Sequence, residues 1–98
     1  MVTKEAVEQA LRDVYDPELG INIVDLGLIY GIEVAGDQVK VTMTLTTRGC
    51  PLHDSMARGA KAAVERIPGV SQAEVEVVWE PAWTPDRLSP AARRALGY

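Results

Sequence analysis

The 98-residue sequence has no phenylalanine, one cysteine and one histidine. Without phenylalanine, the core must be built mostly from valine, isoleucine, leucine, methionine and alanine. A single cysteine cannot form an internal disulfide bond, which suits the reducing cytoplasm. One cysteine and one histidine are also too few ligands for a closed tetrahedral zinc site. We therefore predict a cytoplasmic protein whose one thiol lies neither in a disulfide nor in a structural zinc site.

Long apolar segments and an excess of basic charge are missing too. No apolar run approaches the roughly 20 residues that span a bilayer, and the start MVTKEAVEQAL lacks the apolar core of a signal peptide. The formal net charge is −4, which argues against nucleic acid or an anionic membrane as a partner. There is no glycine-rich phosphate loop and no GxSxG nucleophile elbow. With 47% hydrophobic residues, the chain is predicted to form one globular domain over residues 1–98.

Hydrophobic periodicity predicts helices and strands in alternation. The expected elements are a helix from Thr3 to Asp16-Pro17, a strand over 28–34, a hairpin turn at Gly36-Asp37, a strand over 39–45, a helix from Pro51 to Pro68-Gly69, a strand over 73–80, and short helical starts at Thr84-Pro85 and Ser89-Pro90. This α-β-β-α-β order with a short helical C-terminal tail predicts a two-layer α+β sandwich with a small mixed sheet.

The second expected strand alternates strictly between apolar and polar residues. Its apolar side chains are Val39, Val41, Met43 and Leu45, and its polar side chains are Lys40, Thr42, Thr44 and Thr46. Such alternation predicts a sheet that is buried on one face only.

The segment TTRGCPLHDSM holds the one cysteine and the one histidine. Pro51 fits the first position of a helix, so Cys50 would be the residue that caps it. The unpaired N–H groups and the dipole at a helix start favour a thiolate, as does the positive charge of Arg48. A thiolate attacks electrophiles and binds soft metals, whereas the alternative is a buried structural cysteine. His53 lies one helical turn beyond Cys50, so it is either the partner of a nucleophilic dyad or a solvated side chain.

Acidic, hydroxyl and aromatic residues add further candidates. The Asp16-Pro17-Glu18 segment predicts a turn begun by Asp16 with Glu18 solvated. Asp25 lies among apolar neighbours, so it either caps the Leu26-Gly27 turn or has a functional role. The hydroxyls of Thr46 and Thr47 either donate hydrogen bonds to a bound group, or the two threonines simply end a strand. Trp83 is expected to be a partly exposed lid.

Four segments, DPELGINIVDLGLIYGI, TLTTRGCPL, PGV and PAWTPDRLS, occur in the order and spacing of one family. From about Tyr15 to Leu96 the chain resembles the small iron–sulfur assembly domains typified by SufT, by the eukaryotic cytosolic iron–sulfur targeting subunit and by PaaD of the phenylacetate pathway. The resemblance implies the same α+β sandwich. It also implies an accessory or targeting factor in iron–sulfur cluster assembly, and not an enzyme. The family's motif residues carry over to Asp16, Pro17, Glu18, Asp25, Gly27, Thr46, Thr47, Cys50, Pro51 and Trp83.

In this family Cys50 would be the reactive thiol, acting as a transient cluster ligand or as a thiol relay to client proteins. The pocket beside it would be formed by Asp16, Glu18, Asp25, Thr46, Thr47, His53 and Trp83. One thiolate per chain is too few to hold a cluster. We therefore predict no tightly bound cofactor, but a transient iron–sulfur cluster shared within a homodimer, with a small thiol or with a client. The predicted partners are iron–sulfur assembly proteins and client apo-proteins.

Two other functions are compatible with these residues. The alternative within iron–sulfur assembly is an assembly subunit for an aromatic-ring (phenylacetate-type) hydroxylase. PaaD-type proteins carry a cysteine-rich tail, whereas this sequence has no second cysteine. The alternative of a different class is a cysteine-dependent enzyme that uses the Cys50–His53 pair. Turnover that is lost in both Cys50→Ser and His53→Ala would favour the enzyme. A cluster or client that co-purifies anaerobically would favour the assembly factor.

Overall fold

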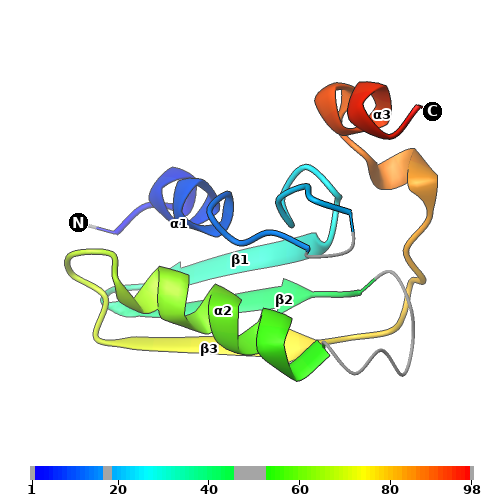
Figure 1. The fold of residues 1–98 in the computed structure, drawn as a ribbon. Helices are drawn as coiled ribbons and strands as arrows, with labels where there is room; N and C mark the ends of the chain where they lie inside the picture. The colour runs from blue at the N-terminus through cyan, green and yellow to red at the C-terminus, as the bar shows by residue number, and fades with distance from the viewer. Residues whose placement is uncertain (1, 17–18, 46–52, 98) are drawn as a thin grey trace.

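The structure, a computed structural model, describes residues 2–16, 19–45 and 53–97, without the side chains of 53–55. Its elements are α1 (Lys4–Leu11), β1 (Ile29–Ala35), β2 (Gln38–Met43), α2 (His53–Glu65), β3 (Gln72–Val77), the 3-10 helix η1 (Pro85–Arg87) and α3 (Pro90–Leu96) (Figure 1). This order confirms the predicted α+β arrangement with a helical tail.

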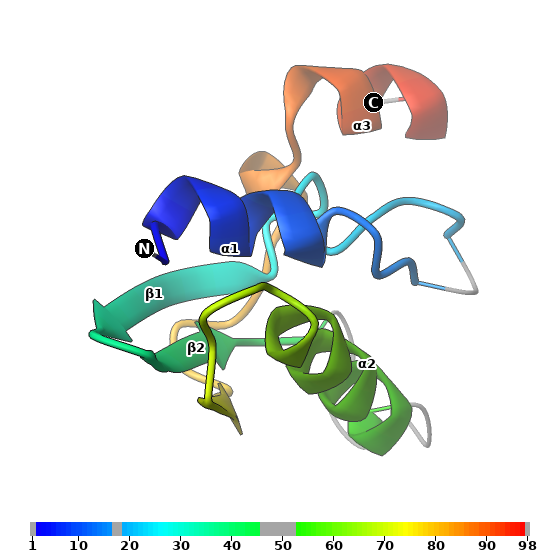
Figure 2. The ribbon, with the colours of Figure 1, turned by 90° about the vertical axis from the view of Figure 1, so that its left-hand side faces the viewer.

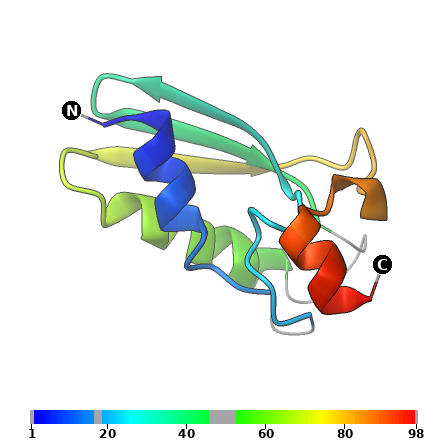
Figure 3. The same cartoon turned by 90° about the horizontal axis from the view of Figure 1, so that it is seen from above.

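The three strands form a mixed sheet in the order β1-β2-β3. β1 and β2 are antiparallel, with Ala35 opposite Gln38 across the predicted Gly36-Asp37 turn. Gly36 has a φ of 64°, the left-handed conformation that a two-residue hairpin turn requires. β2 and β3 are parallel, so α2 is a crossover between them. Both α1 and α2 lie on one face of the sheet (Figure 2), and α3 lies beyond one end of it (Figure 3).

The core lies between that face and the two helices. The predicted apolar face of β2 is buried, since Val39, Val41 and Met43 are at most 3% exposed and Leu45 is 4% exposed. Its partners across the core are the buried residues of α1 and α2, namely Val7, Leu11, Met56, Ala60, Ala63 and Val64. The sheet is therefore covered on one face, as the alternation predicted.

The first helix is shorter than predicted, because it ends at Leu11 and not at Asp16-Pro17. Its start is correct, since the Thr3 hydroxyl accepts a hydrogen bond from the Ala6 N–H at 3.1 Å. Beyond the helix, the N–H of Asp16 donates to the carbonyl of Ile21, and the carbonyl of Val14 accepts from Ile23. Backbone groups that pair with a returning segment cannot also continue a helix. Tyr15, expected to be helical, is 57% exposed.

Thr44 also differs from its predicted position on the exposed face of the second strand, because it is only 1% exposed. Its N–H donates to the carbonyl of Leu28 at 2.8 Å. The segment after β3 contacts β1 near this end, where the Tyr30 hydroxyl donates to the Pro81 carbonyl at 2.7 Å. Simple alternation predicts exposure only where no further segment covers the face.

Candidate functional site

The carboxyl ends of β2 and β3 meet at one edge of the sheet, and α2 begins at the same edge (Figure 1). In sheets with parallel strands and crossover helices, ligands bind beyond the carboxyl ends of the strands. The sequence that joins β2 to α2 here contains Thr46, Thr47 and Cys50. These three residues, Glu18 and the side chain of His53 lie outside the described part of the structure, so their predicted roles stay predictions.

Asp16 is a buried carboxylate, with 6% exposure. Its Oδ1 accepts a hydrogen bond from the N–H of Leu19 at 3.2 Å, and its carbonyl accepts one from Gly20 at 2.8 Å. These bonds confirm the predicted turn that begins at Asp16. A pocket role for its carboxylate remains a prediction.

Asp25 connects three parts of the chain. Its Oδ1 accepts a hydrogen bond from Arg12 Nη1 at 3.1 Å, and its Oδ2 accepts one from Asn22 Nδ2 at 2.7 Å. Its carbonyl accepts one from the N–H of Ser89 at 2.8 Å, which is the residue that caps α3. The carboxylate thus ties the end of α1 to the turn before β1, and the backbone of the same residue holds the tail.

The expected capping of the Leu26-Gly27 turn by the Asp25 carboxylate is wrong. The N–H groups of both turn residues donate to backbone carbonyls instead, Leu26 to Asn22 and Gly27 to Val24. The carboxylate remains free to accept the two side-chain hydrogen bonds. The Asn22 hydrogen bond is the largest effect on the pKa of Asp25 and lowers it; burial opposes this, and the Arg12 charge with hydrogen bonds from Ser89 and Arg12 lowers the pKa further.

This lowered pKa predicts how an Asp25→Asn variant responds to pH. A carboxylate whose pKa is lower in the folded state stabilises the fold above its unfolded pKa of about 3.9 and loses that effect as the pH falls through the folded pKa. We expect the variant to be about 1–2 kcal/mol less stable than the parent near neutral pH. The difference should shrink in strong acid, where the parent is also uncharged.

Urea unfolding at several pH values measures this difference. Asp13→Asn is the matched control, because Asp13 is an exposed aspartate in the same segment. A stability difference that stayed constant from neutral pH down to strong acid would contradict the assigned role of the Asp25 charge.

Residues 78–88, which we call the strap, run past the ends of the strands toward β1 and the turn before it (Figure 3). The indole Nε1 of Trp83 donates to the Leu26 carbonyl at 2.6 Å. The Arg87 guanidinium carbon lies 4.5 Å from the centre of the Tyr30 ring, a cation–π contact. Trp83 is half-buried against the core. It therefore anchors the strap in the described structure, whereas a role as lid remains a prediction.

Sequence reasoning missed four residues of this edge: Arg12, Asn22, Tyr30 and Arg87. The strap contacts join residues 51 positions apart for Tyr30 and Pro81 and 57 apart for Trp83 and Leu26. Local spacing carries no signal for such contacts. Arg12 lies inside the expected helix, so the sequence contains no hint of its ion pair with Asp25.

Metal-binding clusters and membrane-spanning helices are both absent from the described residues. Within these residues, no three histidine, cysteine, aspartate or glutamate side chains gather closely enough to hold a metal ion. No helix in the same part of the chain is long and apolar enough to cross a bilayer.

Known proteins share this sequence and fold. A family model described as "Iron-sulfur cluster assembly protein" matches residues 4–77. The "Fe-S protein maturation auxiliary factor YitW" of Bacillus subtilis is 45% identical over 96% of this chain and 93% of its own. SufT of Staphylococcus aureus, with the same description, is 46% identical over 86% of this chain and 97% of its own. A crystal structure of a domain of unknown function from Bacillus anthracis has a TM-score of 0.92, at 38% identity, and covers 96% of this chain and 91% of that one.

Proposed function

This chain belongs to the iron–sulfur cluster assembly protein family, and we propose that it delivers or relays clusters to client proteins through Cys50. Its role is accessory to iron–sulfur cluster assembly, as in the maturation factors that share almost its whole length. The observation that carries this function is a family match over residues 4–77, the range that contains all of the expected site residues except Trp83.

Two features support Cys50 as the thiol that acts. Its sequence position, between a strand and Pro51, predicts a helix cap, where a thiolate is favoured. The described ends of β2 and α2 meet at the carboxyl edge of the sheet, so the chain that joins them belongs to the usual place for binding residues. In the chain order, Asp25 precedes β1 and Trp83 follows β3, which supports the proposed pocket.

We further propose that the cluster is held transiently by a homodimer in the cytoplasm. One cysteine per chain supplies too few thiolates for a cluster, which takes four protein ligands in common sites. A second subunit, a small thiol or the cysteines of a client would complete the ligand set. The protein then acts by holding and handing over a cluster, not by turning over a substrate.

Anaerobic reconstitution with ferrous iron and sulfide tests this proposal. We expect a labile cluster on a dimer, seen by visible absorption and by mass measurement under native conditions. Cys50→Ser should retain no cluster, because the hydroxyl is a poor ligand for a soft metal site. A cluster on a monomer without added thiol would contradict the shared site. Equal cluster retention by the serine variant would contradict the role of Cys50.

A further inference from the structure

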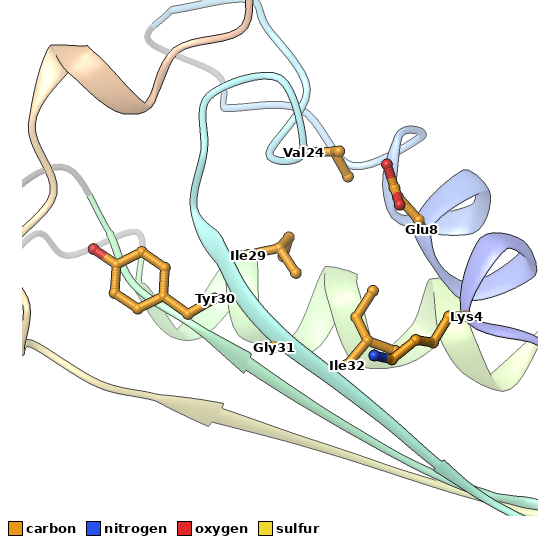
Figure 4. A pocket seen from close by; sticks show the side chains of 7 residues that line it. All are labelled: Lys4, Glu8, Val24, Ile29, Tyr30, Gly31 and Ile32. Carbon is orange, nitrogen blue, oxygen red and sulfur yellow. The ribbon is translucent and has the colours of Figure 1, made fainter.

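The two outer strands of the sheet differ in what lies beside their outer edges. In Figures 1 and 2, α1 lies beyond β1, on the side away from β2. In Figure 4 the side chains of Ile29 and Ile32 point toward α1, whose Lys4 and Glu8 line the same pocket of about 300 Å³. This chain's own helix therefore occupies the space beyond β1, and a further strand cannot be added there.

The outer edge of β3 is open in the described part of the chain. β3 pairs only with β2 in the described sheet, and α2 lies over one face of β3 and not beyond its edge (Figure 2). No other described helix or strand lies beyond β3 on the side away from β2 (Figure 1). A sheet edge of this kind presents unpaired backbone groups to which another chain can add a strand.

The backbone hydrogen bonds show which groups of β3 point outward. The N–H of Val78, the residue after β3, donates to the Met43 carbonyl at 2.8 Å. Val78 therefore directs its backbone groups toward β2. Successive residues of a strand direct theirs to opposite edges. The N–H and C=O groups of Val77 and Val75 are thus directed away from β2, toward the outer edge.

The side chains along this edge are acidic on the open face of the sheet and aliphatic on the covered face. Glu74 and Glu76 are exposed on the open face. Glu76 forms an ion pair with Lys40 at 3.4 Å, whereas Glu74 has no ion pair among the described residues. Val75 and Val77 lie on the face that α2 covers, where they are only partly buried although they pack against the core.

We propose that the β3 edge binds an extended segment of a partner protein as an added strand, with basic side chains opposite Glu74 and Glu76. Main-chain hydrogen bonds to Val75 and Val77 supply affinity, and aliphatic side chains pack beside these two valines, as in other strand-adding domains. The inference rests on the proposed function only in that a client or assembly protein would supply the segment. It needs neither Cys50 nor a cluster.

The acidic side chains favour a basic segment over a second copy of this chain. Two copies paired antiparallel through β3 would place Glu74 and Glu76 of both copies side by side on the same face. Like charges in cross-strand positions oppose pairing, and opposite charges stabilise it. A segment with a basic residue at every second position pairs with both glutamates instead. The homodimer proposed above is thus expected to use another surface.

The test uses a peptide of about nine alternating valine and lysine residues with blocked ends, a length that matches one strand. Amide hydrogen exchange is followed by NMR with and without the peptide. We expect the N–H groups of Val75 and Val77 to exchange rapidly in the free protein and to be slowed by the peptide, while those of β1 stay unchanged. No slowing at these two valines, or equal slowing in β1, would overturn the proposal. Slowing that rises with protein concentration without peptide, together with a doubled mass, would also overturn it by identifying a second copy as the occupant.

Charge reversal provides the matched variants. Glu74→Lys should weaken binding of the lysine peptide about three- to tenfold and improve binding of a valine–glutamate peptide. A variant that merely unfolds would lose both peptides, so the gain for the glutamate peptide keeps the two explanations apart.

Glu33→Lys is the control, because Glu33, Lys40 and Glu74 lie side by side across the three strands. Three strand spacings, about 14 Å, separate Glu33 from the added strand, which exceeds the screening length at physiological salt. Glu33→Lys should therefore change neither affinity by more than about twofold. Equal effects of the two variants would mean non-specific attraction and would overturn the proposal. Because no cluster is present, a failed peptide test leaves the role of Cys50 unaffected, and failed reconstitution leaves the β3 edge unaffected.

Discussion

A Cys50→Ser variant is expected to accumulate as folded protein in cells and to fail in supporting client iron–sulfur enzymes. Serine keeps a side-chain oxygen at the predicted helix cap and is a good capping residue, so stability should change by less than about 1 kcal/mol. The thiolate, however, is lost completely. Complementation of a deletion strain measures both effects side by side, as client enzyme activity and as soluble protein level.

Leu45→Ala is the control for the serine variant, because it should reduce stability and leave the thiol intact. Leu45 follows β2 and is 4% exposed in the core, so truncation should cost about 2–5 kcal/mol. Its soluble level should fall, and client activity should fall only in proportion, because the thiol is intact. Full complementation by Cys50→Ser would show that the thiol is structural. Loss of activity out of proportion to protein level in Leu45→Ala would contradict the separation of folding from function.

The elements that alternate regularly were predictable from the sequence, because local spacing alone determines them. The hairpin followed from Gly36-Asp37 between two alternating segments, and the register confirms it, with Ala35 opposite Gln38. The C-terminal helix followed from Ser89-Pro90, and the Ser89 hydroxyl caps it by accepting a hydrogen bond from the Ala92 N–H at 3.1 Å. In these cases, the residues that decide the structure are neighbours in the chain.

Prediction from the sequence failed where contacts between distant segments determine the local structure. The end of α1 depends on backbone pairing of residues 14–16 with 21–23, which the local sequence does not reveal. Thr44 is buried although alternation places it on the open face, and its hydroxyl has no partner among the described residues. For the site itself, the sequence indicated which residue types matter. It did not reveal that Arg12 and Asn22 engage the carboxylate of Asp25.

Gly27→Ala is expected to be the most disruptive change at the edge that carries the strap. Gly27 has a φ of 77°, a conformation that costs an alanine about 1–2 kcal/mol. A Cβ there would also meet the backbone carbonyl of Arg87 and lie 2.6 Å from the Arg87 Cβ. Arg87 belongs to η1, so relief of the clash requires the strap to move. We expect a total loss of about 2–5 kcal/mol.

Gly20→Ala separates the two contributions. Gly20 has a φ of 69°, close to that of Gly27, but no described atom lies within 4 Å of the position that an alanine methyl group would take there. It should therefore lose only the conformational part, about 1–2 kcal/mol. Amide exchange should rise in η1 and α3 for Gly27→Ala and remain unchanged there for Gly20→Ala, because only Gly27 contacts the strap. If both variants lost the same stability and left the tail equally protected, the close approach of Gly27 to Arg87 would not be what holds the strap in place.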